Sequence, residues 1–256
     1  MPSKSGLIHK YAIAGALAVS SFAVAQPASA LVFDANVTNN VIMGTGIGNG
    51  GWTIDRSNGV ELALRSKERF PTPSGTYNSN GDGTYSWAAG SPPANPGKAF
   101  WSWEWSINSD FDGSGEPIGS YTYEFGVDAD AGPGISFVVN DYIALGGDHS
   151  FGDNSTAQSA GLEAADATAY ATFLATKNLA QNSWQPQWHI PAFDASVDGT
   201  YDFYLAAFDD NGNQLARTAM TVIVGTGGVP VPEPGSLALL ASSLLGFGFM
   251  RRRKKT

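Results

Sequence analysis

Between residues 31 and 229, apolar and polar side chains repeatedly alternate at every second position. The clearest run is WSWEWSI at 101–107, in which three tryptophans and one isoleucine occupy the odd positions. Side chains alternate between two faces in a β-strand, so these four residues share one face of the strand. The pattern therefore predicts strands that bury one face and leave the other polar.

Similar runs recur along the chain and are separated by turn-forming residues. NGDG at 80–83, GPG at 132–134 and DDNG at 209–212 suit tight turns because Gly, Asn and Asp tolerate the backbone angles that turns need. Many short strands with such turns are typical of an all-β, antiparallel β-sandwich that is jelly-roll-like. The further strands are expected at 60–64, 121–127, 135–145, 201–205 and 218–224.

One segment departs from the strand pattern. Asp166 is positioned to cap a helix from Ala167 to about Lys177, since its carboxylate can accept a hydrogen bond from a free N–H of the first turn. We expect one short helix inserted between strands. Two similar segments, TYEF at 122–125 and TYDF at 200–203, each precede an acidic turn and suggest two similar hairpins, one in each sheet.

Charge and cysteine content exclude several classes of function. Residues 31–230 contain 7 Lys and Arg against 22 Asp and Glu, a net charge of −15. Such a surface repels nucleic acid and anionic lipid, so no nucleic-acid partner is expected. The chain has no cysteine, which excludes thiol catalysis and thiolate metal ligands and leaves packing alone to hold the fold.

The N-terminus has the order of features found in a secretory signal peptide. Lys4, His9 and Lys10 precede an apolar stretch at 11–25, and the small residues Ala28 and Ala30 suit cleavage by signal peptidase. We expect residues 1–30 to form a signal helix that is removed on export, and the mature chain to begin at Leu31.

The C-terminus is patterned just as clearly. An apolar stretch at 236–250 is followed by a run of five cations, which fixes the cytoplasmic end of a transmembrane helix. That length gives a helix of about 22 Å, slightly short of a bilayer core. The prolines before it keep the upstream chain extended, where a membrane enzyme can grip it. The stop-transfer cations are Arg251, Arg252, Arg253, Lys254 and Lys255.

This C-terminal order resembles the PEP-CTERM sorting signal of exported bacterial proteins. The motif residues are Val231, Pro232, Glu233 and Pro234. The resemblance implies recognition and cleavage by the membrane enzyme exosortase, transient anchoring in the inner membrane, and delivery to the cell surface or extracellular matrix. It further implies association with exopolysaccharide or biofilm. The alternative is a plain C-terminal membrane anchor. We expect three parts: a signal peptide at 1–30, a β-sandwich domain at 31–229, and a PEP-CTERM sorting signal at 230–256.

Tryptophans offer one candidate binding site. Aromatic rings on a sheet face can stack on the apolar faces of sugars, which makes a carbohydrate-binding module one alternative function. The same rings can instead fill the sandwich core, and this interpretation is favoured because an exposed row would form a large apolar patch. The candidate residues are Trp101, Trp103, Trp105, Trp184 and Trp188.

A calcium site is the second candidate. Asp110, Asp112, Ser114 and Glu116 supply oxygen atoms at alternate positions of a glycine-containing loop, and Ca²⁺ prefers six to eight oxygen ligands. The loop lacks the spacing of an EF-hand, and acidic turns are mostly solvated turns. The sequence thus leaves two interpretations of this loop open, a structural calcium site and an ordinary solvated turn. No other cofactor is expected.

No catalytic constellation is evident. His149 and His189 are 40 positions apart, and neither lies in a metal-ligand or nucleophile motif. A glycosidase needs two carboxylates beside the scissile bond, but the sequence selects no pair. We expect a non-catalytic, secreted surface or extracellular-matrix protein, with a secreted polysaccharide hydrolase as a further alternative.

Overall fold

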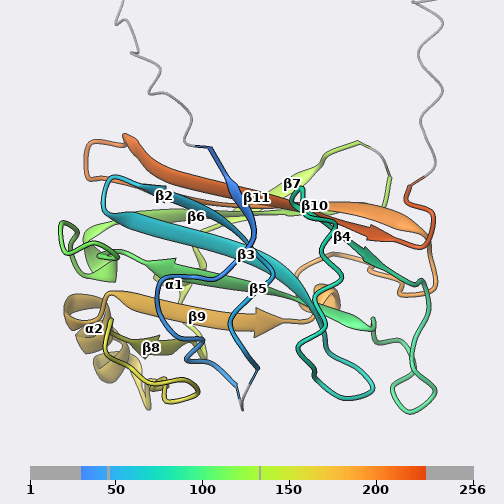
Figure 1. Ribbon diagram of the computed structural model, residues 1–256, viewed down its shortest axis with the longest axis horizontal. Coiled ribbons are helices and arrows are strands. Elements are labelled where there is room, and N and C mark those ends of the chain that lie inside the picture. The colour runs from blue at the N-terminus through green and yellow to red at the C-terminus, as the bar shows by residue number, and fades with distance from the viewer. Residues whose placement is uncertain (1–29, 45–46, 133, 229–256) are drawn as a thin grey trace, which may run out of the picture.

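The computed structural model describes residues 30–44, 47–132 and 134–228. Their strands form two sheets, which run along the long axis of the molecule (Figure 1). The six-stranded sheet has the order β1 (Val32–Ala35), β2 (Trp52–Ser57), β3 (Val60–Glu68), β5 (Trp101–Asn108), β9 (Leu179–Trp184) and β8 (Ser150–Gly152). The five-stranded sheet has the order β4 (Thr84–Trp87), β11 (Gln214–Val224), β10 (Gly199–Phe208), β6 (Thr122–Asp128) and β7 (Phe137–Asn140).

The predicted fold class is confirmed as a β-sandwich. All strand pairs are antiparallel except β4 with β11, which is parallel. The chain passes repeatedly between the two sheets, for example from β3 to β4 and from β5 to β6, which gives the jelly-roll character. The signal helix and the transmembrane helix of the prediction lie outside the described residues.

Most of the expected strands are present, with two corrections. The apolar run at 135–145 is strand only over β7, because the Asp141 carboxylate accepts a hydrogen bond from Ala144 and starts the single-turn helix α1 (Tyr142–Leu145). The two similar segments do not lie in different sheets. They belong to β6 and β10, which pair with each other in the five-stranded sheet.

The inserted helix is confirmed as α2 (Ala167–Thr176), which lies at one end of the sandwich beside β8 and β9 (Figure 1). The Asp166 carboxylate accepts a hydrogen bond from the Ala169 backbone N–H at 2.8 Å, as a helix cap requires. Two 3-10 turns, η1 (Ile118–Ser120) and η2 (Pro186–Trp188), complete the regular structure of the described residues.

The main core fills the space between the sheets. Trp103 of β5 packs against Phe203 of β10 with ring centroids 5.1 Å apart, and Trp105 packs against Phe125 of β6 at 5.2 Å. Aromatic pairs at these separations add to the stability gained from burying their large apolar surfaces. Aromatic contacts between β5 and the opposite sheet therefore help to hold the sandwich together, beside the aliphatic side chains of the same core.

The outer face of the six-stranded sheet is also covered. Residues 37–44 and 47–51, here called the covering segment, cross this face and bury Ala63 of β3 together with Trp52 and Ile54 of β2. The segment is tied down by hydrogen bonds: the Ile42 N–H donates to Gln181, and Arg65 donates to the carbonyls of Gly48 and Gly50. Polar side chains of this face are consequently buried beneath it.

Candidate functional site

The tryptophan row lies in the core. Trp101, Trp103 and Trp105 are essentially fully buried between the sheets, and Trp184 is buried beside them. Trp184 contacts Trp103 and Trp105 edge to face, with centroids 5.0 and 5.4 Å away. Rings enclosed in this way cannot stack on a glycan, so these four tryptophans are core residues and not a sugar-binding surface.

Trp188 differs from the other four candidates. It lies in η2 with 54 % of its surface exposed, and the structure does not bring it into the buried aromatic cluster. An exposed indole offers an apolar face and one N–H donor to a ligand. It is the one tryptophan of the five that is free to contact a sugar.

Both histidines of the described chain are built into the aromatic core. His189 stacks on Trp184 with centroids 4.4 Å apart, and burial lowers the pKa of His189 to about 4. Burial is also the main cause of the lowered pKa of His149, whose ring contacts the carbonyl of Tyr142 and the side-chain amide of Asn182. Both rings are therefore neutral at pH 7 and act as packing groups.

The acidic loop at 110–116 uses its carboxylates to close turns. Asp112 Oδ1 accepts hydrogen bonds from the Ser114 N–H and hydroxyl at 3.0 and 2.6 Å, and Asp110 Oδ1 accepts one from the Gly115 N–H. Within residues 30–44, 47–132 and 134–228, no group of three or more His, Cys, Asp or Glu side chains is arranged to hold a metal ion. The four-residue oxygen set with Ser114 and Glu116 gains no support from this geometry.

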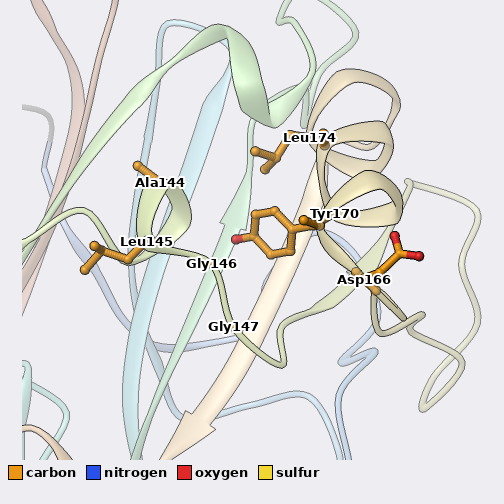
Figure 2. A pocket seen from close by; sticks show the side chains of 10 residues that line it. Ala144, Leu145, Gly146, Gly147, Asp166, Tyr170 and Leu174 are labelled. Atoms are coloured by element: carbon orange, nitrogen blue, oxygen red, sulfur yellow. The ribbon is translucent and has the colours of Figure 1, made fainter.

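One cavity lies between helix α2 and the loop after α1. Its volume is about 410 Å³, and Figure 2 shows Tyr170 and Leu174 of α2 facing Leu145, Gly146 and Gly147. The Tyr170 hydroxyl donates to the carbonyl of Ile143 at 2.8 Å, while Asp166 is occupied as the helix cap. This cavity is a largely apolar cleft, and the ionisable groups among its lining residues are Asp166 and Tyr170, each of which makes a hydrogen bond within the fold.

A second cavity, of about 250 Å³, is charged. It opens between the covering segment and β3, and Lys67, Arg69, Glu104 and Ser183 form its polar side. Lys67 Nζ lies 2.5 Å from Glu104 Oε1, and both side chains are buried. Val41, Met43, Gly44, Ile47, Thr72 and Pro73 line the remainder. We call this cavity the basic pocket.

Arg65 lies behind the basic pocket and shares the same carboxylate. Arg65 Nε is 2.6 Å from Glu104 Oε2, and the guanidinium lies over the rings of Trp52 and Tyr77. Burial raises the pKa of Glu104, but the opposing effect of Arg65 and Lys67 is larger in sum, and the pKa lies below its ordinary value. Glu104 is therefore ionised at neutral pH.

Comparison with known families decides where the chain is delivered. The model of the PEP-CTERM protein-sorting motif matches residues 230–254. The chain is a PEP-CTERM domain-containing protein. Neither the curated proteins nor the solved structures contain a match to the chain.

The sorting motif confirms the predicted localisation of this PEP-CTERM protein. It indicates an exported precursor that is anchored in the membrane and processed by exosortase for the cell surface or the extracellular space. The motif residues Val231 to Pro234 and the stop-transfer cations Arg251 to Lys255 lie outside the described residues, as does Ala28. Ala30 is the first described residue and is exposed. No helix among the described residues is long and apolar enough to cross a membrane.

The basic pocket of the PEP-CTERM protein is the feature that the sequence analysis missed. The signal was available as cations at 65, 67 and 69, which are three of the seven in residues 31–230 and alternate along the end of β3 and the residue that follows it. Alternation places such residues on one face. It does not reveal that the covering segment, residues 37–44 and 47–51, lies over this face and turns it into a pocket.

Proposed function

We propose that the β-sandwich is a non-catalytic module that associates with exopolysaccharide in the matrix or biofilm around the cell. The observation that carries this proposal is the PEP-CTERM sorting motif, which follows the sandwich in the chain. The cavity beside α2 is in keeping with it, because its one carboxylate, that of Asp166, caps the helix. Export to the surface places the domain among extracellular polymers. An apolar cleft without free acid–base groups supports binding rather than bond cleavage.

The two histidines support the same proposal. General acid–base catalysis works best with a group whose pKa lies near the working pH. His189 has a pKa of about 4 and is packed against Trp184. Burial also lowers the pKa of His149. Neither ring is arranged to move a proton to or from a substrate at neutral pH.

The test uses polysaccharide isolated from the producing cells. The exported protein is mixed with the polymer and sedimented, and the supernatant is assayed for new reducing ends. Co-sedimentation without reducing ends is the expected result. Release of reducing ends would overturn the non-catalytic proposal in favour of a secreted hydrolase, and a protein that stays wholly in the supernatant would contradict polysaccharide association.

A carbohydrate-binding module based on Trp188 is the second candidate. The observation that favours it is the 54 % exposure of this indole, against the burial of the other four candidate tryptophans. A Trp188→Ala variant that loses co-sedimentation while keeping its thermal unfolding midpoint would support this candidate. Trp87→Phe, at a buried indole, is the matched aromatic control.

A further inference from the structure

The basic pocket contains more positive than negative charge. Lys67 and Arg69 face one carboxylate, that of Glu104, and Arg65 already shares that carboxylate from behind. The surrounding domain is strongly acidic, with 22 Asp and Glu against 7 Lys and Arg in residues 31–230. A local excess of cations in such a domain requires a specific explanation.

Arg65 is explained by the fold. Its Nη1 donates to the carbonyls of Gly48 and Gly50 at 3.1 and 2.7 Å, its Nε pairs with Glu104, and its guanidinium stacks on Trp52. These contacts hold the covering segment against β3. Arg65 therefore stabilises the wall of the pocket and is not available to a ligand.

Lys67 and Arg69 have no comparable role. Lys67 is 4 % exposed, and its ammonium, which carries three donors, pairs among the described residues only with Glu104. The side chain of half-buried Arg69 makes no hydrogen bond or ion pair with any described residue. Lys67 therefore has donors left over after its pairing with Glu104, and the partly exposed guanidinium of Arg69 keeps its donors available to a ligand.

The size and lining of the pocket limit what that group can be. Its volume of about 250 Å³ lies below the range of roughly 300–1,000 Å³ for sites that enclose a drug-sized molecule, so it suits one sugar ring or one substituent. Val41, Met43 and Pro73 supply apolar surface, and the hydroxyls of Ser183 and Thr72 supply further hydrogen-bonding groups. A sugar ring presents both kinds of surface.

We infer that the basic pocket binds a singly charged sugar, through a carboxylate or sulfate ester held by Lys67 and Arg69. The inference rests on the proposed function and names the substituent that the domain recognises. Arg69 supplies a planar fork that matches such an anion, and Lys67 supplies a compact positive charge. The net negative charge of the domain repels a long polyanion, so we expect the charge to be presented at a chain end or on a single branch.

The binding test uses D-glucuronate, with D-glucose as the neutral match and glucose 6-sulfate as the second anion. Calorimetry on the full chain in mild detergent measures the dissociation constants. Glucuronate or the sulfate is expected to bind at least about ten-fold more tightly than glucose, equivalent to 1.4 kcal/mol. The tighter of the two anions identifies the substituent. Equal affinity for glucose and both anions would overturn the inference.

Variants locate the site. Arg69→Gln should weaken binding of the anion about ten-fold, and Arg69→Lys, which keeps the charge but loses the planar fork, should bind with an affinity between those of the parent and of Arg69→Gln. Lys98→Gln, which removes one cation from another partly buried position, should bind like the parent protein. Thermal unfolding midpoints confirm that each variant is folded. Unchanged affinity in Arg69→Gln would contradict the assignment of the pocket.

The two proposals can fail separately. If Arg69→Gln loses glucuronate but still co-sediments with the native polysaccharide through other surfaces, the pocket binds anions and polymer association has another source. If neither the parent nor the variant co-sediments, polysaccharide association itself is wrong. If the parent co-sediments but shows no preference for a charged sugar, the basic pocket alone is refuted.

Discussion

The Nε atom of Arg65 lies 2.6 Å from Oε2 of Glu104, and both side chains are buried on the face of the sheet that points away from the main core. Lys67 Nζ lies 2.5 Å from the other oxygen of the same carboxylate. One carboxylate therefore serves as the shared counter-charge of two buried cations. Glu104 is thus the only carboxylate that the described residues place against these two cations, and it is fully buried.

Replacing that carboxylate should be strongly destabilising. Glu104→Gln keeps the shape of the side chain but leaves two buried cations without a counter-charge, which typically costs about 3–5 kcal/mol. Urea unfolding followed by tryptophan fluorescence measures the change. Glu163→Gln, at an exposed position, is the matched control and should change stability by less than about 0.5 kcal/mol. Equal stabilities of the two variants would show that the buried ion pairs contribute little.

The stability of the protein should fall as the pH drops from about 6.5 to about 4. The pKa of His189 is lowered from 6.5 to about 4 by burial, so in this range the unfolded chain binds a proton that the folded chain does not. Stability rises with pH wherever the unfolded state binds more protons, so the contribution is present above 6.5 and lost below.

The measurement compares thermal midpoints of the parent and of His189→Phe across this range. The variant keeps an aromatic ring against Trp184 but cannot be protonated, so its midpoint should fall less steeply between pH 6.5 and 4. His9→Phe removes a histidine from the expected signal peptide and should leave the slope unchanged. Identical slopes in all three proteins would contradict a role for His189.

Truncation to alanine should lower the stability of the protein strongly at Trp103 and only slightly at Trp188. Trp103→Ala removes a fully buried ring that contacts Phe203 and Trp184, and should cost about 3–5 kcal/mol of unfolding free energy. Trp188→Ala removes a largely exposed ring and should cost less than about 1 kcal/mol. Denaturant unfolding of both variants checks the difference. A large loss in Trp188→Ala would show that its indole packs in solution.

The sequence predicted the sandwich because alternation survives wherever one face of a strand meets the core. The run at 101–107 became β5 with its three tryptophans inside, and Asp166 capped α2 as expected. The run at 135–145 was misread as one strand, since alternation carries no sign that the Asp141 carboxylate begins a helical turn. Local hydrogen bonding decided that boundary.

The basic pocket could not be predicted because it depends on contacts between distant segments. Lys67 and Glu104 are neighbours through the pairing of β3 with β5. The pocket also needs Val41, Met43, Gly44 and Ile47 of the covering segment, which form part of its lining. Short β2 and β9 were also missed. Both strands are covered on both faces of the sheet, so nearly all of their side chains are buried. Their sequences therefore show little alternation between apolar and polar residues.

The exposed edge strand β7 should promote self-association. Ala129 donates its N–H to the Ser136 carbonyl, so by antiparallel alternation the backbone groups of Phe137 and Val139 point away from β6. Phe137, Val138 and Val139 are all exposed, and no charged residue interrupts 131–140. An apolar edge with free backbone groups is a site for strand addition, which natural proteins normally block with charge.

Val139→Lys should therefore lower concentration-dependent association without lowering stability. The new ammonium sits on an exposed side chain that is 46 % accessible, so unfolding free energy should change by less than about 0.5 kcal/mol. Light scattering and sedimentation velocity over a concentration series measure the effect. Gln214→Lys adds the same charge at an exposed position of β11, and association like that of the parent is expected there. If both lysine variants reduce association equally, net charge rather than the β7 edge controls it.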